Sequence, residues 1–235
     1  MTTRILMIVT SCNWMGNTDK PTGLWAEELA VPYYTLIDAG ASVVIASTAG
    51  GKTPIDPGSV KALGENEPAV ERMLADMALQ AKLENTIPIL DLNPEDFDAI
   101  FFPGGHGTMW DLPADRCVKA AVEYAFGKGK FIASVCHGAA GLVSAIRSDG
   151  LPMVHGKRVN SFTDSEEREV GLAGVVPFML ESRLRELGGI FVGGDNWHAF
   201  AIRDGQLITG QNPQSSAKVA EILLDAIGID VCEWN

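Results

Sequence analysis

The cysteine at position 136 carries the clearest chemical signal in this 235-residue sequence. It comes directly after the mainly apolar run 131–135 and is followed by His137 and then by the small residues that begin at Gly138. An apolar strand that stops at a nucleophile and turns sharply into a helix is the pattern of a nucleophile elbow. The positive end of the helix dipole would favour the thiolate of Cys136. A buried free cysteine at a strand end is the alternative interpretation.

A second turn that could take part in catalysis lies in the run 101–107, where two phenylalanines and a proline lead into Gly104, Gly105 and His106. Backbone N–H groups exposed by such a turn, together with the N–H of His137, would form an oxyanion hole beside the elbow. His106 is a candidate pocket residue. Glycines that only close a turn are the alternative. A phosphate-binding loop is disfavoured, because neither GxGxxG nor Walker spacing is present.

Two acidic residues, Glu27 and Glu28, follow the run Thr22-Gly23-Leu24-Trp25 at the start of an expected helix. Acidic groups in a first helical turn complement the helix dipole, so a solvated face is one interpretation. A helix that follows the first strand of a parallel sheet also begins at the carboxyl edge of that sheet. One of the two glutamates could therefore reach Cys136.

Composition favours a globular protein with a large core, since 46% of the residues are hydrophobic and the mean hydropathy is +0.11. The 18 basic and 30 acidic residues give a net charge of −12, which argues against nucleic acid or an anionic membrane as the main partner. No apolar run reaches the roughly 20 residues of a membrane span, and the apolar stretch in the first nine residues is too short for a signal peptide. We expect a cytoplasmic protein that binds neither membrane nor nucleic acid.

The four cysteines, Cys12, Cys117, Cys136 and Cys232, show no metal-type spacing and do not form a disulfide framework. We therefore expect reduced thiols and no metal site.

Short apolar runs alternate with longer helical patterns along the chain, which predicts a doubly wound α/β fold with a mainly parallel sheet flanked by helices. We expect strands at 4–11, 42–47, 99–103, 131–135 and 158–162, and helices at 24–38, 69–82, 114–127, 137–146 and 176–187. A hairpin over 197–209 turned at Asp204-Gly205, and a helix after Asn212-Pro213, complete the pattern. Folds of this class bind ligands at the carboxyl ends of the strands, where Cys136 is predicted to lie.

We predict one domain over residues 1–235, because no linker or repeat divides the chain. Two stretches, 50–68 and 83–96, are longer than ordinary connections and are candidate cap or lid insertions. Surface insertions without a role are the alternative.

Several ordered motifs resemble the ThiJ/PfpI superfamily of class I glutamine amidotransferase-like proteins, and most closely its glutathione-independent glyoxalase III and heat-inducible chaperone branch. The motifs are Gly23–Pro32, Pro103–Gly107, Ala133–Leu142, Ser161–Glu167 and Ile208–Pro213. The resemblance implies a flavodoxin-like fold and a homodimer.

The same resemblance implies roles for individual residues. Cys136 matches the nucleophile, His137 the histidine that follows it, and Glu28 the helix glutamate that hydrogen-bonds the thiol. The acidic third member of the triad matches Glu167, with Asp164 and Glu166 as less favoured candidates.

The activity implied by the resemblance is conversion of methylglyoxal, or another small 2-oxoaldehyde, to lactate or the matching 2-hydroxy acid, with no metal and no cofactor. Cys136 would add to the aldehyde, and Glu28, with a pKa raised by burial, would move the proton between the two carbons. A holdase chaperone and an amidase, peptidase, deglycase or isonitrile-hydrating enzyme with the same cysteine are the alternatives. A true glutamine amidotransferase is disfavoured, because Ala199 and Phe200 follow His198 where a His-x-Glu pattern would be needed.

Overall fold

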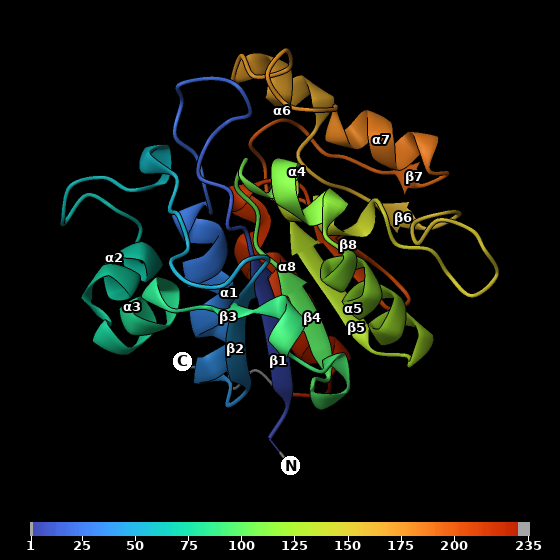
Figure 1. The fold of residues 1–235 in the computed structure, drawn as a ribbon, viewed down its shortest axis with the longest axis horizontal. Coiled ribbons are helices and arrows are strands. Elements are labelled where there is room, and N and C mark those ends of the chain that lie inside the picture. Colours follow the sequence, from blue (N-terminus) through green and yellow to red (C-terminus); the bar gives the residue numbers. More distant parts are fainter. Residues whose placement is uncertain (1, 230–235) are drawn as a thin grey trace.

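The computed structural model describes residues 2–229 and is built around a seven-stranded sheet with the order β3-β2-β1-β4-β5-β9-β8 (Figure 1). Every neighbouring pair in this sheet is parallel except β8 and β9, which form an antiparallel hairpin. A separate parallel pair joins β6 and β7. The strands are β1 (Arg4–Val9), β2 (Ser42–Ser47), β3 (Ile87–Pro88), β4 (Ala99–Phe102), β5 (Phe131–Val135), β6 (Arg158–Val159), β7 (Ile190–Phe191), β8 (Ala201–Asp204) and β9 (Leu207–Gly210).

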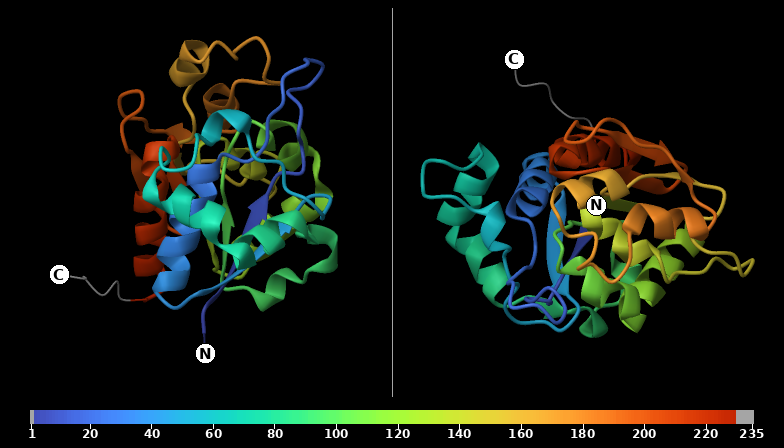
Figure 2. Two further views of the ribbon diagram at one scale, coloured as in Figure 1. Left: turned by 90° about the vertical axis from the view of Figure 1, so that its left-hand side faces the viewer. Right: turned by 90° about the horizontal axis from the view of Figure 1, so that it is seen from above.

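Helices cover both faces of the sheet, as a parallel sheet requires. One apolar core packs α1 and α8 with α2 and α3 against one face, and a second core packs α5 with α4 and α7 against the other. Seen from above, α1 and α8 lie on one side of the sheet and α5 on the opposite side (Figure 2). The helices are α1 (Ala26–Asp38), α2 (Pro68–Ala75), α3 (Met77–Glu84), α4 (Thr108–Asp111), α5 (Arg116–Gly127), α6 (Asp164–Glu169), α7 (Leu180–Glu186) and α8 (Ser216–Ala226).

The predicted doubly wound α/β fold is therefore confirmed. Strands β2 and β5 have the predicted bounds, and β1 and β4 end one or two residues early. The predicted hairpin is present, with its turn at Gly205 and Gln206 between β8 and β9. No helix within residues 2–229 is long and apolar enough to cross a membrane. The thiols of Cys12, Cys117 and Cys136 are free, and Cys232 lies outside the described residues.

Several predicted elements differ from the structure for local reasons. The helix predicted at 69–82 is two helices, because the Asp76 carboxylate accepts hydrogen bonds from the N–H groups of Ala78 and Leu79 and starts α3 anew. The helix predicted at 137–146 is a 3₁₀ helix over Cys136–Leu142. The strand predicted at 158–162 is reduced to β6 and pairs with β7 instead of joining the main sheet. The helix predicted at 176–187 begins only at Leu180.

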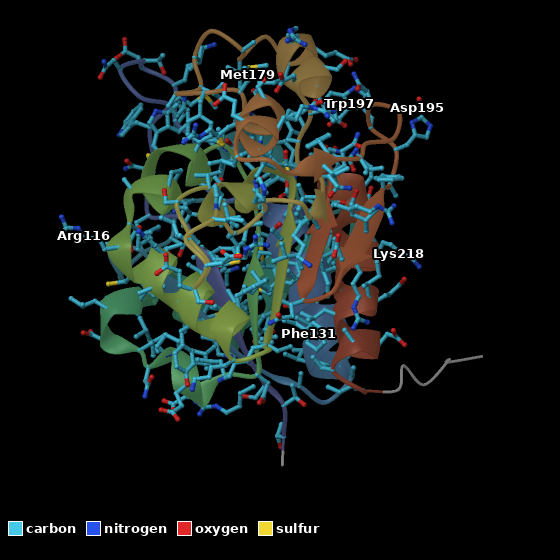
Figure 3. The ribbon with its side chains drawn as sticks, turned by 90° about the vertical axis from the view of Figure 1, so that its right-hand side faces the viewer. Arg116, Phe131, Met179, Asp195, Trp197 and Lys218 are labelled. Atoms are coloured by element: carbon cyan, nitrogen blue, oxygen red, sulfur yellow. The ribbon has the colours of Figure 1, made fainter. Side chains whose placement is uncertain are left out.

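A long segment between β6 and β8, which includes α6, α7 and β7, lies over the carboxyl ends of the central strands (Figures 1 and 2). Figure 3 shows that Trp197, which belongs to this segment, lies far from Phe131, the first residue of β5. The two long stretches singled out in the sequence lie elsewhere. Within 50–68, Ile55 forms an isolated β-bridge with Leu24, and the hydroxyl of Ser59 accepts a hydrogen bond from the N–H of Ala26. The stretch 83–96 contains the edge strand β3.

Gly138 allows the turn after β5 to pack directly on β4. A Cβ atom at this position would lie closer than 3.0 Å to the carbonyl carbon and oxygen of Phe102. Both neighbours are backbone atoms in the centre of the sheet, so they cannot move aside cheaply. The small residue after the elbow is thus a packing requirement.

We expect Gly138→Ala to lower the free energy of unfolding by about 1–3 kcal/mol, the usual cost of overpacking. Chemical denaturation measures the change. Gly127→Ala at the end of α5 is the matched control, since a Cβ there meets nothing within 4 Å. Equal stability of the two variants would contradict the packing argument.

Candidate active site

Cys136 stands at the end of β5 with a backbone φ of 55°, a left-handed conformation that a non-glycine residue rarely adopts. Val135 before it is extended, and a 3₁₀ helix begins at Cys136 itself. Its side chain is 3% exposed. Such strain persists where the surrounding structure fixes it, and here it turns the Sγ atom out of the strand toward neighbouring elements. The predicted elbow is therefore present in the backbone.

Glu28, in the first turn of α1, is fully buried beside this elbow. Its Oε2 atom accepts a hydrogen bond of 2.9 Å from the N–H of Gly104, and its Oε1 atom has no partner among the described residues. A Cβ atom on Gly104 would collide with this carboxyl, so the glycine makes room for it. Burial raises the pKa of Glu28 well above its usual value, against the lowering effects of Cys136 and Gly104. Glu27 is more exposed, so Glu28 is the glutamate that turns inward.

The thiol of Cys136 is held in its protonated form, contrary to the thiolate predicted from a helix dipole. Burial and the adjacent Glu28 carboxyl raise the pKa of Cys136 well above the usual thiol value, and only the backbone N–H of His137 opposes them. The 3₁₀ helix spans only Cys136–Leu142, so its end carries little of the macrodipole of a long α-helix. Desolvation therefore opposes the thiolate more strongly than this short helix end favours it.

His137 and His106 share one carboxylate, that of Glu167. The His137 Nε2 atom lies 2.7 Å from Glu167 Oε2, and the His106 Nε2 atom lies 2.9 Å from Glu167 Oε1. Because a carboxylate only accepts, both histidines donate through Nε2–H, and in neutral His137 this leaves Nδ1 unprotonated. The Nδ1 atom of His137 lies 3.3 Å from Cys136 Sγ. Glu167 thus fixes the tautomer in which His137 can accept the thiol proton.

The charges in this row follow from burial and pairing. Burial, and next the neighbouring His106, lower the pKa of His137 to about 4. Burial alone would raise the pKa of Glu167, but the hydrogen bonds from His106 and His137 outweigh it and lower that pKa to about 2. At neutral pH, Glu167 is a carboxylate and His137 is a neutral imidazole.

Gly105 presents a backbone donor next to the nucleophile. Its φ of 105° is a glycine conformation, and a Cβ there would lie closer than 3.0 Å to Gly23 O and Trp25 N. The Gly105 N–H has no acceptor among the described residues. With the N–H of His137 it has the chemistry of an oxyanion hole.

A small pocket opens above these groups, with about 70 Å³ available to the centre of a water-sized molecule. One water needs roughly 10–15 Å³ by this measure, so the space suits a molecule of a few atoms. Trp197 and Phe162 stack edge to face at 5.6 Å in its wall. The lining consists of Trp25, Glu28, Gly105, His106, Cys136, His137, Phe162, Val170, Trp197 and Pro213. Within residues 2–229, no lysine or arginine and no residue of 50–68 or 83–96 belongs to this lining.

The aromatic wall was not foreseen from the sequence. Phe162, Val170 and Trp197 belong to the segment between β6 and β8, and no local pattern marks a loop residue as a pocket wall. The one available signal was that Phe162 lies within the Ser161–Glu167 motif. His198 is exposed and bonds the carbonyl of Asn196, away from the pocket lining.

Glu166, a less favoured candidate for the third triad member, is buried but bonds away from His137. Its Oε2 atom accepts from the N–H and hydroxyl of Thr163, completing a capping box at the start of α6. Its Oε1 atom accepts from Trp197 N at 2.9 Å, Gln211 Nε2 at 3.1 Å and Asn212 Nδ2 at 2.9 Å. Trp197 has a φ of 62°, so Glu166 holds a strained wall residue in place.

Asp164, the other less favoured candidate, bonds the N–H and hydroxyl of Ser182 in α7. Of the three acidic candidates, only Glu167 contacts His137.

The fold and this site define a class: α/β proteins with a buried cysteine at a strand-end elbow. The model of the DJ-1/PfpI family matches residues 22–226, so the chain belongs to that family. The resemblance inferred from the motifs is confirmed. In a structural comparison, glyoxalase III from Candida albicans matches with a TM-score of 0.86 and 28% identity, covering 95% of this chain and 97% of that one.

Curated relatives carry two kinds of enzyme name. A glutathione-independent glyoxalase of Schizosaccharomyces pombe is 32% identical over 85% of this chain and 85% of its own length. A Staphylococcus aureus protein named protein/nucleic acid deglycase is 25% identical over 87% of this chain and 72% of its own length. These relatives support an enzyme.

We expect Glu166→Gln to lower the free energy of unfolding by roughly 1–3 kcal/mol. The NH₂ group of the glutamine would face N–H or O–H donors that now bond a carboxylate oxygen of Glu166. Urea denaturation measures the effect. Glu65→Gln is the control, since Glu65 is an exposed residue. A loss no larger than that of the control would show that Glu166 does not support the pocket wall.

We also expect a pH-dependent stability difference between the wild type and Glu28→Gln. The pKa of Glu28 is higher in the folded than in the unfolded protein, so wild-type stability is greatest below the unfolded carboxyl pKa and falls as the pH rises toward the folded value. The glutamine variant lacks this loss. Melting temperatures measured from pH 5 to pH 8 should therefore diverge in favour of Glu28→Gln, relative to the exposed control Glu65→Gln. A difference independent of pH would contradict the burial argument.

Proposed function

We propose that the protein is a glyoxalase III-type enzyme that converts methylglyoxal or another small 2-oxoaldehyde to the 2-hydroxy acid without glutathione. The observation that carries the proposal is a buried thiol, Cys136, that lies between a protonatable carboxyl, Glu28, and the free Nδ1 of His137. An internal transfer of hydrogen between two carbons needs a nucleophile and an acid–base group on the same small substrate. The glyoxalase names among the relatives support the same reaction.

In the first step, Cys136 Sγ bonds to the aldehyde carbon. The thiol proton passes to His137 Nδ1, where the Glu167 carboxylate stabilises the resulting imidazolium. The former carbonyl oxygen develops negative charge beside the N–H of Gly105 and takes the proton of Glu28, which gives a neutral hemithioacetal. Because Glu28 starts protonated, it ends this step as the carboxylate that the next step requires.

In the second step, the Glu28 carboxylate removes the proton from the first carbon, and the ketone oxygen takes the proton of His137, which forms an enediol. Glu28 then returns its proton to the second carbon, while the hydroxyl of the first carbon gives its proton to His137 and becomes the thioester carbonyl. A base with a raised pKa is suited to removing a proton from carbon.

In the third step, water hydrolyses the thioester. Glu28 takes a proton from the attacking water, and the departing sulfur of Cys136 takes the proton of His137. The product leaves as the 2-hydroxy acid, and all three groups return to their starting protonation states. His137 and Glu28 therefore exchange roles as acid and base through the cycle.

Pocket size favours free aldehydes over adducts on protein side chains. The space above Cys136 is small and apolar, and Val170 and Trp197 border it. A methyl group fits such a wall, whereas a peptide-linked adduct needs a wider opening. The deglycase name of one relative makes deglycation the second candidate. The homodimer and the cytoplasmic location stay predictions.

We expect lactate to form from methylglyoxal in glutathione-free, EDTA-treated buffer. Cys136→Ser should abolish turnover, and Glu28→Gln should lower kcat by at least about 10²-fold, the usual contribution of general acid–base catalysis. Glu28→Gln should still accumulate a covalent adduct at Cys136, visible by mass spectrometry. Glu27→Gln is the matched control from the same helical turn, and we expect its rate to stay near that of the wild type.

Equal lactate formation by the wild type and Cys136→Ser would remove the glyoxalase proposal. Release of lactate from a methylglyoxal-modified arginine peptide at a rate comparable to the free aldehyde would favour the deglycase candidate instead.

A further inference from the structure

Three metal-ligating side chains converge at the floor of the pocket. Ligand atoms of His106, His137 and Glu167 all lie within 4.8 Å of one another, and all three residues are buried. Both histidines face the carboxylate with the same ring nitrogen, Nε2, at 2.9 and 2.7 Å. We propose that this cluster is an inhibitory binding site for Zn²⁺ or a similar divalent transition metal ion.

The donor set matches zinc rather than a hard cation. Two imidazole nitrogens and one carboxylate oxygen are ligands that zinc accepts at about 2.0–2.2 Å, whereas Mg²⁺ and Ca²⁺ prefer sites built from oxygen. The shared acceptor already points both Nε2 atoms at one place. A cation there replaces the two N–H···O bonds, and its fourth position is left to water.

The charges around the cluster favour a cation. Two carboxyl groups, those of Glu167 and Glu166, are buried here, and no lysine or arginine lines the pocket among the described residues. A buried acidic site without a basic residue attracts positive charge. Both His106 and His137 border the pocket, so an ion can enter along the route that substrate would take.

Metal binding would disable the proposed nucleophile without touching it. With Nε2 of His137 bound to metal, the ring carries its proton on Nδ1, the atom that lies 3.3 Å from Cys136 Sγ. His137 then cannot accept the thiol proton, and Glu167 no longer fixes the productive tautomer. This loss of turnover depends on the proposed function, whereas the binding itself does not.

Calorimetric titration of the apoprotein with ZnCl₂ tests the site directly. A Cys12→Ser, Cys117→Ser, Cys232→Ser background leaves Cys136 as its only thiol. We expect one ion per chain, at least about tenfold weaker binding in His106→Asn, and unchanged binding in the control His198→Asn, whose histidine is exposed. MgCl₂ should not compete. Circular dichroism of each variant checks that it is folded.

Cobalt(II) gives a second measurement on the unmutated site. We expect d–d absorption bands typical of a tetrahedral nitrogen and oxygen site, with no thiolate-to-metal charge-transfer band. A charge-transfer band, or zinc binding in His106→Asn as tight as in the wild type, would overturn the proposed ligands. Zinc binding that leaves methylglyoxal turnover unchanged in an active enzyme would overturn the inhibition, while absence of turnover without zinc would count against the proposed function alone.

Discussion

The close contact between the two strand-end turns, one after β4 and one after β5, is the constraint on which the rest of the site depends. Gly104 and Gly138 lack side chains, so the backbone of one turn lies directly against the other. This approach leaves just enough room for the Glu28 carboxyl, which bonds the N–H of Gly104. A larger residue at either position would push the two turns apart, and with them the proposed nucleophile Cys136 and its proposed acid–base partner Glu28. Sheet packing and chemistry are therefore set by the same two glycines.

Three glutamates within one small region are buried, and each has a different environment. Glu28 has one hydrogen bond and an oxygen without a partner among the described residues, and burial raises its pKa well above the usual value. Glu167 accepts from two imidazoles and stays ionised. Glu166 accepts five hydrogen bonds, one of them from the N–H of the wall residue Trp197, and holds these segments together. Environments that separate the pKa values of like groups are how one site obtains both acid and base functions.

The sequence predicts the frame of this site better than its wall. Continuous apolar runs identify β2 and β5, and the position of Cys136 after β5 follows from them. The choice between Glu27 and Glu28 came from the family resemblance, because residues adjacent on a helix differ by about 100° in direction and local pattern favours neither. Trp197 could not be foreseen, since its place depends on a long-range bond from its N–H to Glu166. The break at Asp76 likewise depends on capping, which competes with apolar periodicity.

A protonated thiol is consistent with this arrangement. A permanent thiolate at Cys136 would be a negative charge in a desolvated pocket, and both burial and the adjacent Glu28 carboxyl raise the pKa of Cys136. Holding the proton on sulfur and the proton on Glu28 keeps the pair neutral until a carbonyl arrives. In the proposed reaction the substrate supplies the oxygen that receives negative charge, and the backbone N–H of Gly105 would stabilise that charge only at this point. The proposed activation is thus coupled to binding, because the groups that ionise would do so only when a partner for the charge is present.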